Sequence, residues 1–574
     1  MEERLNRARE EQARRELGET EVAAGPAWLL IGAFLLSLLS VAGVQHLGSW
    51  ARPGAAEVDG RAGAAPLQWA ALLSEPPTDC SLEAFESGLE GALVVGRWAL
   101  PRVQLFLTRV LGAGNEEVYA GRAGWLFHRT GIDYPSGPPF LDPGRLRARR
   151  NNADRCDPLP QPDPIPAIRR LHEDLDARGI RLIVMPTPVK AVIHPEGFSS
   201  RYTAAPTSAP LQNPSFHAFL ARLKAIGVGV FDPAPLLHEW EEAKGNGAAY
   251  LATDTHWRPG AMAAVAEGLA DVVEQRADLS DRSSLPYQRG ALQVSNFGDL
   301  TTMLTLPQGQ ALFPPERVTI APIRGPDGRP WQPQEDAEVL LLGDSFANVY
   351  SNREAFTNRV AGREYHWGEG AGLAEQLSFF LQRPVDRIVR NAGGSHTTRR
   401  DLARSIESEA ERGRDRLGRV RVVVYQFAVR ELASGDWQEI ELPPAPEALS
   451  QPRARPGAAE GGQERLIRGT IAARASLPRP YTVPYKDCLF ALHLTGVEAP
   501  SGEPAATEVV AYLWGMRDNV WTEAAGFRVG QEITLRVRSW EDPEAQERYA
   551  SHNRKELDDP ELLALPAFWA EPQD

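Results

Sequence analysis

The chain has 574 residues, which is too long for one ordinary domain and enough for two or three. Hydrophobic residues make up 43% of it and charged residues 24%, a balance typical of globular proteins. Its 62 lysines and arginines against 76 aspartates and glutamates give a formal net charge of −14. This charge argues against a general nucleic-acid-binding function, because such a function usually needs a basic face.

The N-terminal segment predicts a membrane anchor. Residues 1–21 are a dense mixture of arginine and glutamate, and residues 22–44 carry no charge at all. The uncharged stretch is about the ~20 residues that a helix needs to cross a bilayer, and it is longer than the apolar core of a cleaved signal peptide. We therefore expect residues 22–44 to be a retained transmembrane signal anchor, with a buried core helix as the alternative.

The arginines around this span predict its orientation. More of them precede the span than follow it closely, which places residues 1–21 in the cytoplasm and the bulk of the chain outside. In a bacterial cell this describes a single-pass protein of the inner membrane whose main part lies in the periplasm.

Two loop-rich regions follow the span. We expect residues 45–115 to form a helical stalk and the proline-rich residues 135–166 to form a long surface excursion. The three cysteines, Cys80, Cys156 and Cys488, lack the spacing of a metal site. In an exported chain Cys80–Cys156 is the expected disulfide, because both cysteines flank the same loop-rich region; three unpaired thiols are the alternative.

Residues 116–442 alternate between short apolar strands and amphipathic helices. This alternation predicts an α/β domain with a mainly parallel sheet flanked by helices on both faces. The expected strands are 181–185, 228–231, 338–342, 387–389 and 420–426, and the expected helices are 168–178, 216–226, 259–275, 371–381 and 400–412.

The pattern changes after residue 442. Residues 443–464 are rich in proline, alanine, glycine and arginine and are typical of a linker. Residues 465–574 contain β-rich segments punctuated by glycine, which predict a small β domain, with a barrel of the oligonucleotide/oligosaccharide-binding kind as a candidate. We expect its last thirty residues to be helix and polar loop. Trp514, Trp521 and Trp540 are either sugar-stacking residues or core residues of this domain.

A serine follows the most apolar of the expected strands, in the motif Gly343-Asp344-Ser345-Phe346. In an open parallel sheet, ligands bind beyond the carboxyl ends of the strands. A serine in such a turn exposes its hydroxyl, and the N–H groups of the following helix can face an oxyanion. The alternative is that this motif only shapes the turn and caps the helix.

A carboxylate and an imidazole stand two residues apart earlier in the chain, in Asp254-Thr255-His256-Trp257. The spacing places both side chains on one side of an extended turn, where the carboxylate can orient the imidazole. With Ser345 they supply the nucleophile, the base and the orienting acid of a serine esterase or acyltransferase. The alternatives are a surface loop with a capping aspartate, and a metal site that lacks nearby further ligands.

These motifs, in this order, resemble the alginate O-acetyltransferase family. Its members are SGNH-hydrolase-like proteins in which the acid–base pair precedes the nucleophile. The resemblance covers about residues 115–440 and includes three further stretches, Gly121–Phe127, Met185–Lys190 and Tyr425–Leu432.

The resemblance implies transfer of an acetyl group to a hydroxyl of an exported polysaccharide, with a membrane-bound O-acyltransferase as the acetyl donor and without a cofactor or metal. Ser345 would be the nucleophile, His256 the general base and acid, and Asp254 the residue that orients His256. The backbone N–H of Ser345 would contribute to the oxyanion hole, and Asn391 is the candidate for its second donor. A turn residue before two glycines is the alternative for Asn391.

The sequence offers further candidate residues and alternative functions. Arg258 and Tyr350 are candidates for substrate contacts, with packing as the alternative for each. Family members that act on alginate can carry a carbohydrate-binding β-sandwich, which residues 465–574 do not match, so the substrate need not be alginate. Two further hypotheses are a carbohydrate acetyl-esterase with the same three residues and a non-catalytic scaffold of a polysaccharide assembly complex.

Overall fold

The computed structural model describes residues 94–573 apart from gaps. The gaps are 152–158, 205–208, 245–246, 281–285, 308, 445–463, 479, 481–482, 484, 499–505, 541, 543–548, 550–551, 558–561 and 563–564. The predicted signal anchor, most of the predicted stalk, most of the predicted linker and the cysteine pair Cys80–Cys156 lie outside the described residues. None of the described helices combines the length and the apolar character that a membrane span requires.

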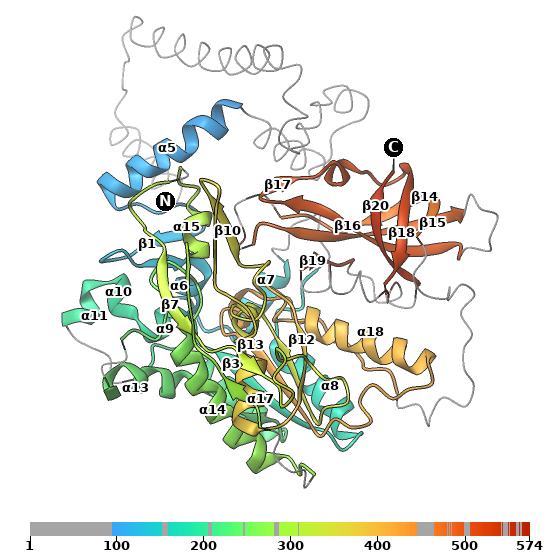
Figure 1. The fold of residues 1–574 in the computed structure, drawn as a ribbon, viewed down its shortest axis with the longest axis horizontal. Helices are drawn as coiled ribbons and strands as arrows, with labels where there is room; N and C mark the ends of the chain where they lie inside the picture. Colours follow the sequence, from blue (N-terminus) through green and yellow to red (C-terminus); the bar gives the residue numbers. More distant parts are fainter. Residues whose placement is uncertain are drawn as a thin grey trace, which may run out of the picture.

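A five-stranded parallel sheet forms the centre of the larger domain, with the strand order β12-β9-β13-β3-β4. Three of its strands, β12, β13 and β3, are labelled in Figure 1. Each pairing in this sheet is parallel, as the alternation of strands and helices predicts. Both β9 and β13 are buried along their whole length, which explains their continuous apolar sequences. The strands are β3 (Arg181–Thr187), β4 (Gly229–Val230), β9 (Val339–Gly343), β12 (Val385–Val389) and β13 (Val422–Ala428).

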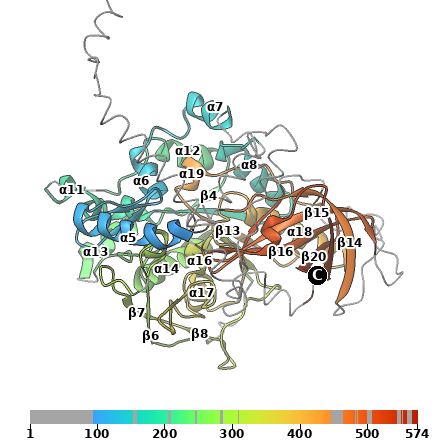
Figure 2. The ribbon, with the colours of Figure 1, turned by 90° about the horizontal axis from the view of Figure 1, so that it is seen from above.

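Helices cover both faces of this sheet. Figure 2 shows α8 and α12 on one side of β13, and α14 and α17 on the other. The pairs α14–α17 and α8–α12 also pack against each other. These helices are α8 (Pro164–Asp176), α12 (Phe216–Ala225), α14 (Pro259–Arg276) and α17 (Leu373–Leu381). Two more helices matter for the site. They are α16 (Ser345–Asn348), at the carboxyl edge of the sheet, and α18 (Thr397–Glu411), which packs on the sheet.

Two antiparallel additions near the carboxyl edge were not expected from the sequence. One is the hairpin of β1 (Val118–Ala120) and β2 (Leu126–His128). The other is a four-stranded sheet in the order β10-β11-β6-β7. Its strands are β6 (Leu292–Asn296), β7 (Glu316–Ile320), β10 (Thr357–Val360) and β11 (Arg363–His366).

The prediction that residues 135–166 form a long surface excursion is partly wrong. The segment 135–166 contains α7 (Pro143–Asn151), and its Phe140 and Leu141 are buried in the main core. Proline-rich composition does not prevent a segment from packing, because proline fits the first turn of a helix, where its missing N–H is not needed.

The C-terminal domain is a closed barrel with a hydrophobic core of its own. If its five main strands are numbered in chain order, their order around the barrel is 1-2-3-5-4, and strand 4 pairs with strand 1. Strands 3 and 5 are parallel, which is the connectivity of oligonucleotide/oligosaccharide-binding barrels. The five strands are β14 (Arg465–Arg474), β15 (Cys488–Glu498), β16 (Glu508–Arg517), β18 (Glu532–Ser539) and β20 (Ala567–Pro572).

The expectation of helix and polar loop for the last thirty residues is wrong. This region supplies β20, which closes the barrel, and β19 (Asn553–Lys555), which pairs with β15. Both strands are too short to show a repeating pattern of their own. The core interpretation holds for Trp540, which stacks on Trp569 with ring centroids 4.1 Å apart.

Candidate functional site

The turn after β9 holds Ser345 at the first position of α16. Asp344 fixes this turn, because its carboxylate accepts hydrogen bonds from the backbone N–H groups of Phe346 (2.9 Å) and Ala428 (2.8 Å) and from the side chain of Gln426 (2.9 Å). No described residue accepts a hydrogen bond from the N–H of Ser345. The serine is therefore placed by two neighbouring strands of the sheet, and its own N–H stays available to a ligand.

His256 lies directly against Ser345. Its Nε2 is 2.8 Å from the Ser345 Oγ, and its Nδ1 is 2.7 Å from an oxygen of Asp254. All three side chains are buried. With Nδ1 donating to the carboxylate, Nε2 is free to accept the proton of the serine hydroxyl. The structure thus brings the two sequence motifs together in one hydrogen-bonded chain.

Asp254 is fully supplied with hydrogen-bond donors. One oxygen also accepts from the N–H of His256 (3.0 Å), and the other accepts from the indole of Trp367 (2.9 Å) and the N–H of Asp299 (3.2 Å). Burial acts to raise the pKa of Asp254, but the charge of His256 and these hydrogen bonds outweigh it and hold the pKa at about 2. The carboxylate is therefore ionised wherever the imidazole has to be oriented.

A second carboxylate, which sequence reasoning missed, lies beside this pair. Asp299 Oδ2 is 3.9 Å from His256 Nδ1, and its other oxygen accepts from the N–H of Thr255 (2.7 Å). Burial and the adjacent charge of Asp254 raise the pKa of Asp299 to about 6. Nothing in the short stretch around Asp299 marks it, since an acidic residue is common in the first turn of a helix, where it begins α15 (Asp299–Met303).

Asp254, His256 and Asp299 also have the residue types of a metal site, with ligand atoms within 4.8 Å of one another. Their polar atoms already serve the hydrogen bonds described above. A cation bound there would have to compete with the contact between His256 and Asp254, so the arrangement is better suited to proton transfer than to metal binding.

Several residues hold the loop that carries His256. Glu316 accepts from the N–H groups of Ala252 (3.1 Å) and Thr253 (2.8 Å) and from Arg258 (3.1 Å). Lys190 is buried and donates to the carbonyl oxygens of Leu126 (2.8 Å) and Ala252 (3.0 Å), and burial lowers its pKa to about 8. Two of the stretches that carry the family resemblance, at Leu126 and Lys190, therefore converge on this loop.

The remaining sequence candidates lie near the site in different roles. Tyr350 is completely buried, and its hydroxyl donates to the carbonyl of Trp257 (2.7 Å), so its position supports packing of the loop and not exposure to a substrate. Burial raises its pKa. Asn391 follows β12 as Ser345 follows β9, and its Oδ1 accepts from the side chain of Asn348 on α16 (3.1 Å).

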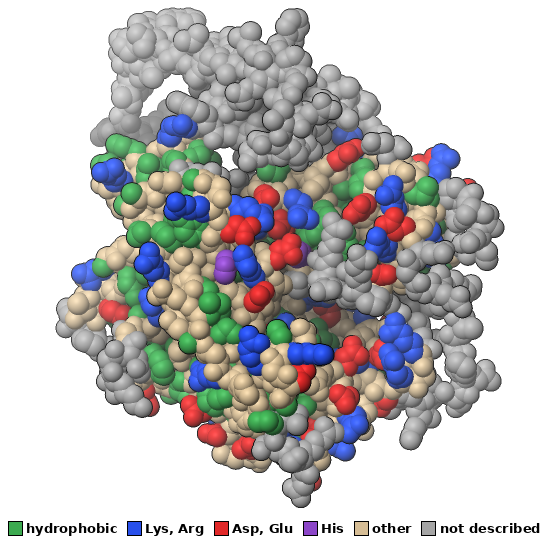
Figure 3. All heavy atoms as spheres, viewed as in Figure 1, with side chains coloured by type: hydrophobic (Ala, Val, Ile, Leu, Met, Phe, Trp, Pro, Cys, Tyr) green, Lys and Arg blue, Asp and Glu red, His purple; other side chains and the backbone are tan. Residues whose placement is uncertain are grey.

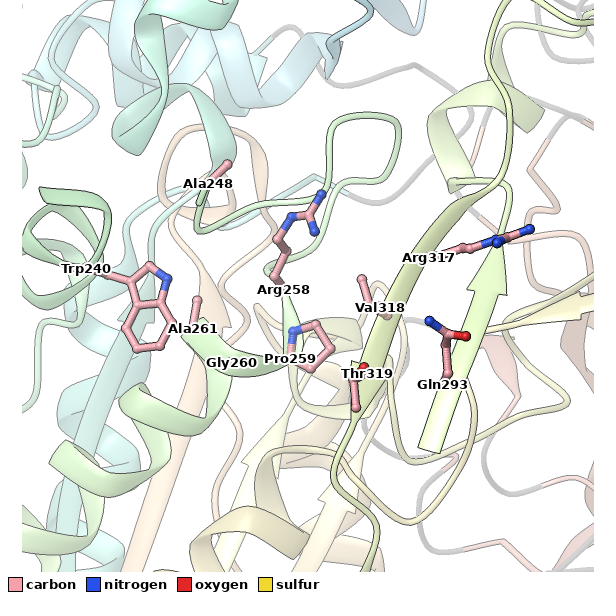
Figure 4. Close-up of a pocket in the computed structure, with 10 residues that line it drawn as sticks. All are labelled: Trp240, Ala248, Arg258, Pro259, Gly260, Ala261, Gln293, Arg317, Val318 and Thr319. Carbon is pink, nitrogen blue, oxygen red and sulfur yellow. The ribbon is translucent and has the colours of Figure 1, made fainter. Parts of the chain in front are cut away.

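Arg258 lines an open pocket that does not include Ser345 or His256 (Figure 4). The pocket has a volume of about 290 Å³ and lies where the start of α14 faces β7. Its lining combines an aromatic ring with polar and basic side chains: Trp240, Ala248, Arg258, Pro259, Gly260, Ala261, Gln293, Arg317, Val318 and Thr319. On the face of the molecule shown in Figure 3, basic and acidic side chains are interleaved.

The α/β domain of this chain matches the model of a known protein family. A family model described as "SGNH hydrolase-like domain, acetyltransferase AlgX" matches residues 118–428. Proteins called probable alginate O-acetylase AlgJ are 29% identical over 237 residues in Pseudomonas aeruginosa and 28% identical over 258 residues in Pseudomonas syringae pv. tomato. These matches cover 40% and 44% of this chain, and 53% and 58% of the relatives. The chain thus spans little more than half the length of these relatives.

Solved structures of AlgJ and AlgX are also similar to this chain, at lower sequence identity. The O-acetyltransferase domain of Pseudomonas putida AlgJ gives a TM-score of 0.38 at 22% identity, covering 55% of this chain and 92% of that one. Pseudomonas aeruginosa AlgX gives a TM-score of 0.39 at 14% identity, covering 74% and 92%. Because the family model spans more than half of the residues, the chain belongs to the family of SGNH hydrolase-like acetyltransferases related to AlgX.

Proposed function

We propose that this protein transfers acetyl groups to hydroxyls of an exported polysaccharide through an acyl-enzyme formed on Ser345. The observation that carries the proposal is the buried chain of hydrogen bonds from Ser345 through His256 to Asp254, at the carboxyl edge of the parallel sheet. Membership of an acetyltransferase family supports the acetyl group as the one transferred.

The first half-reaction forms the acyl-enzyme. Ser345 Oγ attacks the carbonyl carbon of the acetyl donor while its proton passes to His256 Nε2. The tetrahedral intermediate then collapses, the bond to the donor's leaving group breaks, and the leaving group takes the proton from His256. Asp254 stabilises the imidazolium that exists between these two transfers.

The second half-reaction uses the same groups in reverse. A hydroxyl of the acceptor attacks the acetyl carbonyl of the acyl-serine and gives its proton to His256 Nε2. The ester bond to Ser345 breaks, and Oγ recovers the proton from the imidazolium. The oxyanion of both intermediates would be bound by the N–H of Ser345 and the side-chain amide of Asn391, whose Nδ2 donates to no described residue.

The setting of this chemistry is part of the proposal. We infer that residues 22–44 anchor the chain in the bacterial inner membrane, with the α/β domain and the barrel in the periplasm. The acetyl donor would be a membrane-bound O-acyltransferase that delivers the group across the bilayer, and the acceptor an exported polysaccharide. The name of the AlgJ relatives supports a polysaccharide acceptor, although they match only part of this chain.

The test is the acetyl content of the exported polysaccharide in cells that carry Ser345→Ala. We expect acetylation to fall to background, because loss of the nucleophile removes about 10⁴-fold or more of the rate. Ser200→Ala is the matched control, since Ser200 is exposed on α11 (Ser200–Ala204). Acetylation that survives Ser345→Ala at the control level would refute the proposal. Purified full-length protein that hydrolyses an acetyl ester equally well with and without oligosaccharide would point to an esterase.

A further inference from the structure

A buried ionic contact joins the barrel to the loop that carries Asn391. Asp401 of α18 accepts from Arg390 through one carboxylate oxygen and from Arg554 Nη2 (2.5 Å) through the other. The exposed fractions of these side chains are 7% for Asp401, 10% for Arg390 and zero for Arg554. Arg390 directly precedes Asn391, whereas Arg554 belongs to β19 of the barrel. One carboxylate is therefore shared by two arginines from different domains.

Arg554 is held firmly within the barrel. Its Nε donates to Glu556 (2.5 Å), and its guanidinium lies 4.4 Å from the ring centroid of Trp540 and 4.9 Å from that of Tyr512. The hydroxyl of Tyr512 donates to the same Glu556 carboxylate (2.6 Å). A guanidinium fixed by a carboxylate and two rings has little rotamer freedom. Its position is therefore set by the barrel and not by Asp401 alone.

The loop from Arg390 to Gly394 depends on contacts that fix its backbone. Ala392 has a φ of +57°, in the left-handed region of backbone conformation that residues other than glycine rarely adopt. A Cβ on Gly394 would lie 3.2 Å from the Asp344 carboxylate, so the loop packs closely on the turn before Ser345. A backbone in this conformation persists only where its surroundings fix it. Tyr425 supplies one contact, through a hydrogen bond to the carbonyl of Gly394 (2.6 Å), and the Arg390–Asp401 pair supplies another.

We propose that Arg554 of the barrel is a positioning residue for acyl transfer. Through Asp401 and Arg390 it fixes the loop that holds Asn391 beside Ser345, so the barrel completes a site whose reacting groups all come from the α/β domain. This inference rests on the proposed function, because it assigns Asn391 to the oxyanion hole.

The experiment is a double-mutant cycle in the full-length protein. The rate constant for acylation of Ser345 is measured from the release of p-nitrophenolate from p-nitrophenyl acetate, in Arg554→Gln, Asn391→Ala and the double variant. Thermal unfolding shows that each variant is folded. We expect Asn391→Ala to slow acylation about 10²- to 10³-fold. Arg554→Gln should slow it about 10- to 100-fold, with little change in KM, because a small displacement of an oriented group is costly.

The decisive result is the double variant. If Arg554 acts through Asn391, the double variant is about as slow as Asn391→Ala alone, because residues of one unit are not additive. The control, Arg468→Gln, removes an exposed ion pair of the barrel and should leave the rate unchanged. If Arg554→Gln does not fold, Arg554→Lys takes its place in the same cycle.

Two outcomes overturn the inference and are distinct from failure of the proposed function. An acylation rate in the Arg554 variant equal to that of the control would exclude a positioning role. Rate losses that multiply in the double variant would show that Arg554 acts independently of Asn391. Failure of the proposed function would instead appear as acylation that persists in Ser345→Ala.

Discussion

At the scale of single residues, the two neighbouring carboxylates Asp254 and Asp299 differ in how readily they ionise. Asp254 receives a hydrogen bond on every side, from the His256 ring, two backbone N–H groups and the Trp367 indole. Asp299 receives one from Thr255, and its Oδ2 has no hydrogen-bond partner. Two buried carboxylates this close do not both ionise readily, so the better-supplied one takes the charge. Asp254 is therefore the candidate that orients His256.

The first prediction tests this division. Asp254→Asn should lower kcat for acetyl-ester turnover by about 10³- to 10⁴-fold, because an amide cannot hold the imidazole tautomer that accepts the serine proton. Asp299→Asn is the matched change next to it and should lower kcat by less than about tenfold. Initial rates of the folded full-length variants provide the measurement. Equal losses in the two variants would mean that the carboxylates share the role.

The second prediction concerns the pH dependence of stability. The pKa of Asp299 rises from 3.8 to about 6 in the folded protein. Between these values the folded state keeps a proton that the unfolded state releases, so the free energy of unfolding falls as pH rises through this window. Asp254, whose pKa is held at about 2, has the opposite sign and loses its contribution as pH falls from 3.8 towards 2.

Asp299→Asn should therefore flatten the decrease of Tm between pH 4 and 6.5. Thermal unfolding of wild type and variant across this range measures the effect. Asp327→Asn, at an exposed loop position, is the control and should leave the slope of the wild type in place. A slope that is the same in all three proteins would contradict the protonated state of Asp299.

At the scale of elements, strand and helix approach each other closely at the turn from β9 to α16. A Cβ on Gly343 would lie 2.7 Å from the Cβ of Ala347 and 3.1 Å from the side-chain oxygen of Gln426. That same oxygen accepts from the N–H of Asp344 (2.9 Å). The close approach of strand and helix thus depends on the missing side chain at this position.

The third prediction follows from this contact. Gly343→Ala should destabilise the protein by about 1–3 kcal/mol through overpacking, and it should lower activity because the displaced turn carries Ser345. Gly526→Ala is the control, since a Cβ there meets no atom within 4 Å, and it should change stability by less than about 0.5 kcal/mol. Urea unfolding of both variants gives the comparison. Equal stabilities would show that the turn relaxes without cost.

The elements that the sequence predicts well are those buried on both faces. The expected strands 338–342 and 420–426 are observed as β9 and β13, because complete burial requires unbroken apolar sequence. The sheet containing β6 and β7 was missed for the opposite reason. These strands are half exposed, and their sequences show no apolar run that would distinguish them from loops.

The residues of the site could likewise be predicted only where the local sequence carries a pattern. The Asp254–His256 pair and Ser345 are recognisable because each stands in a short motif whose spacing has a chemical meaning. Asp299 and Glu316 are single acidic residues among 76, far along the chain from the loop that they support. Only the folding of the chain brings them there, so no local pattern could have revealed them.

At the scale of the whole molecule, two separate hydrophobic cores are joined by a polar interface. The barrel lies next to α18 of the larger domain (Figure 1). Across this contact Arg404 of α18 pairs with Glu556 (3.1 Å), and Arg400 donates to the carbonyl of Leu557 (3.1 Å). Buried ion pairs of this kind are poor sources of net stability, but their geometry fixes how two surfaces meet. The relative placement of the domains therefore depends on a few charged residues.

The fourth prediction is that Glu556 couples the two domains. Its carboxylate serves Arg404, Arg554 and Tyr512 and is 3% exposed, so Glu556→Gln removes the charge that pairs with Arg404 and leaves Arg554 with Asp401 alone. The expected loss is about 3–5 kcal/mol in the free energy of unfolding. Glu532→Gln breaks an exposed pair with Arg468 on the same barrel and should cost less than about 1 kcal/mol.

Urea unfolding followed by both fluorescence and circular dichroism distinguishes the outcomes. In the wild type, coupling through the interface should make the two signals change together, because neither domain can separate without exposing the buried charges. In Glu556→Gln the signals should separate into two transitions as the domains unfold independently. If Glu556→Gln and Glu532→Gln had equal effects, the buried carboxylate would not couple the domains. The coupling of the two domains would then depend on other contacts, such as the pair of Arg554 and Asp401.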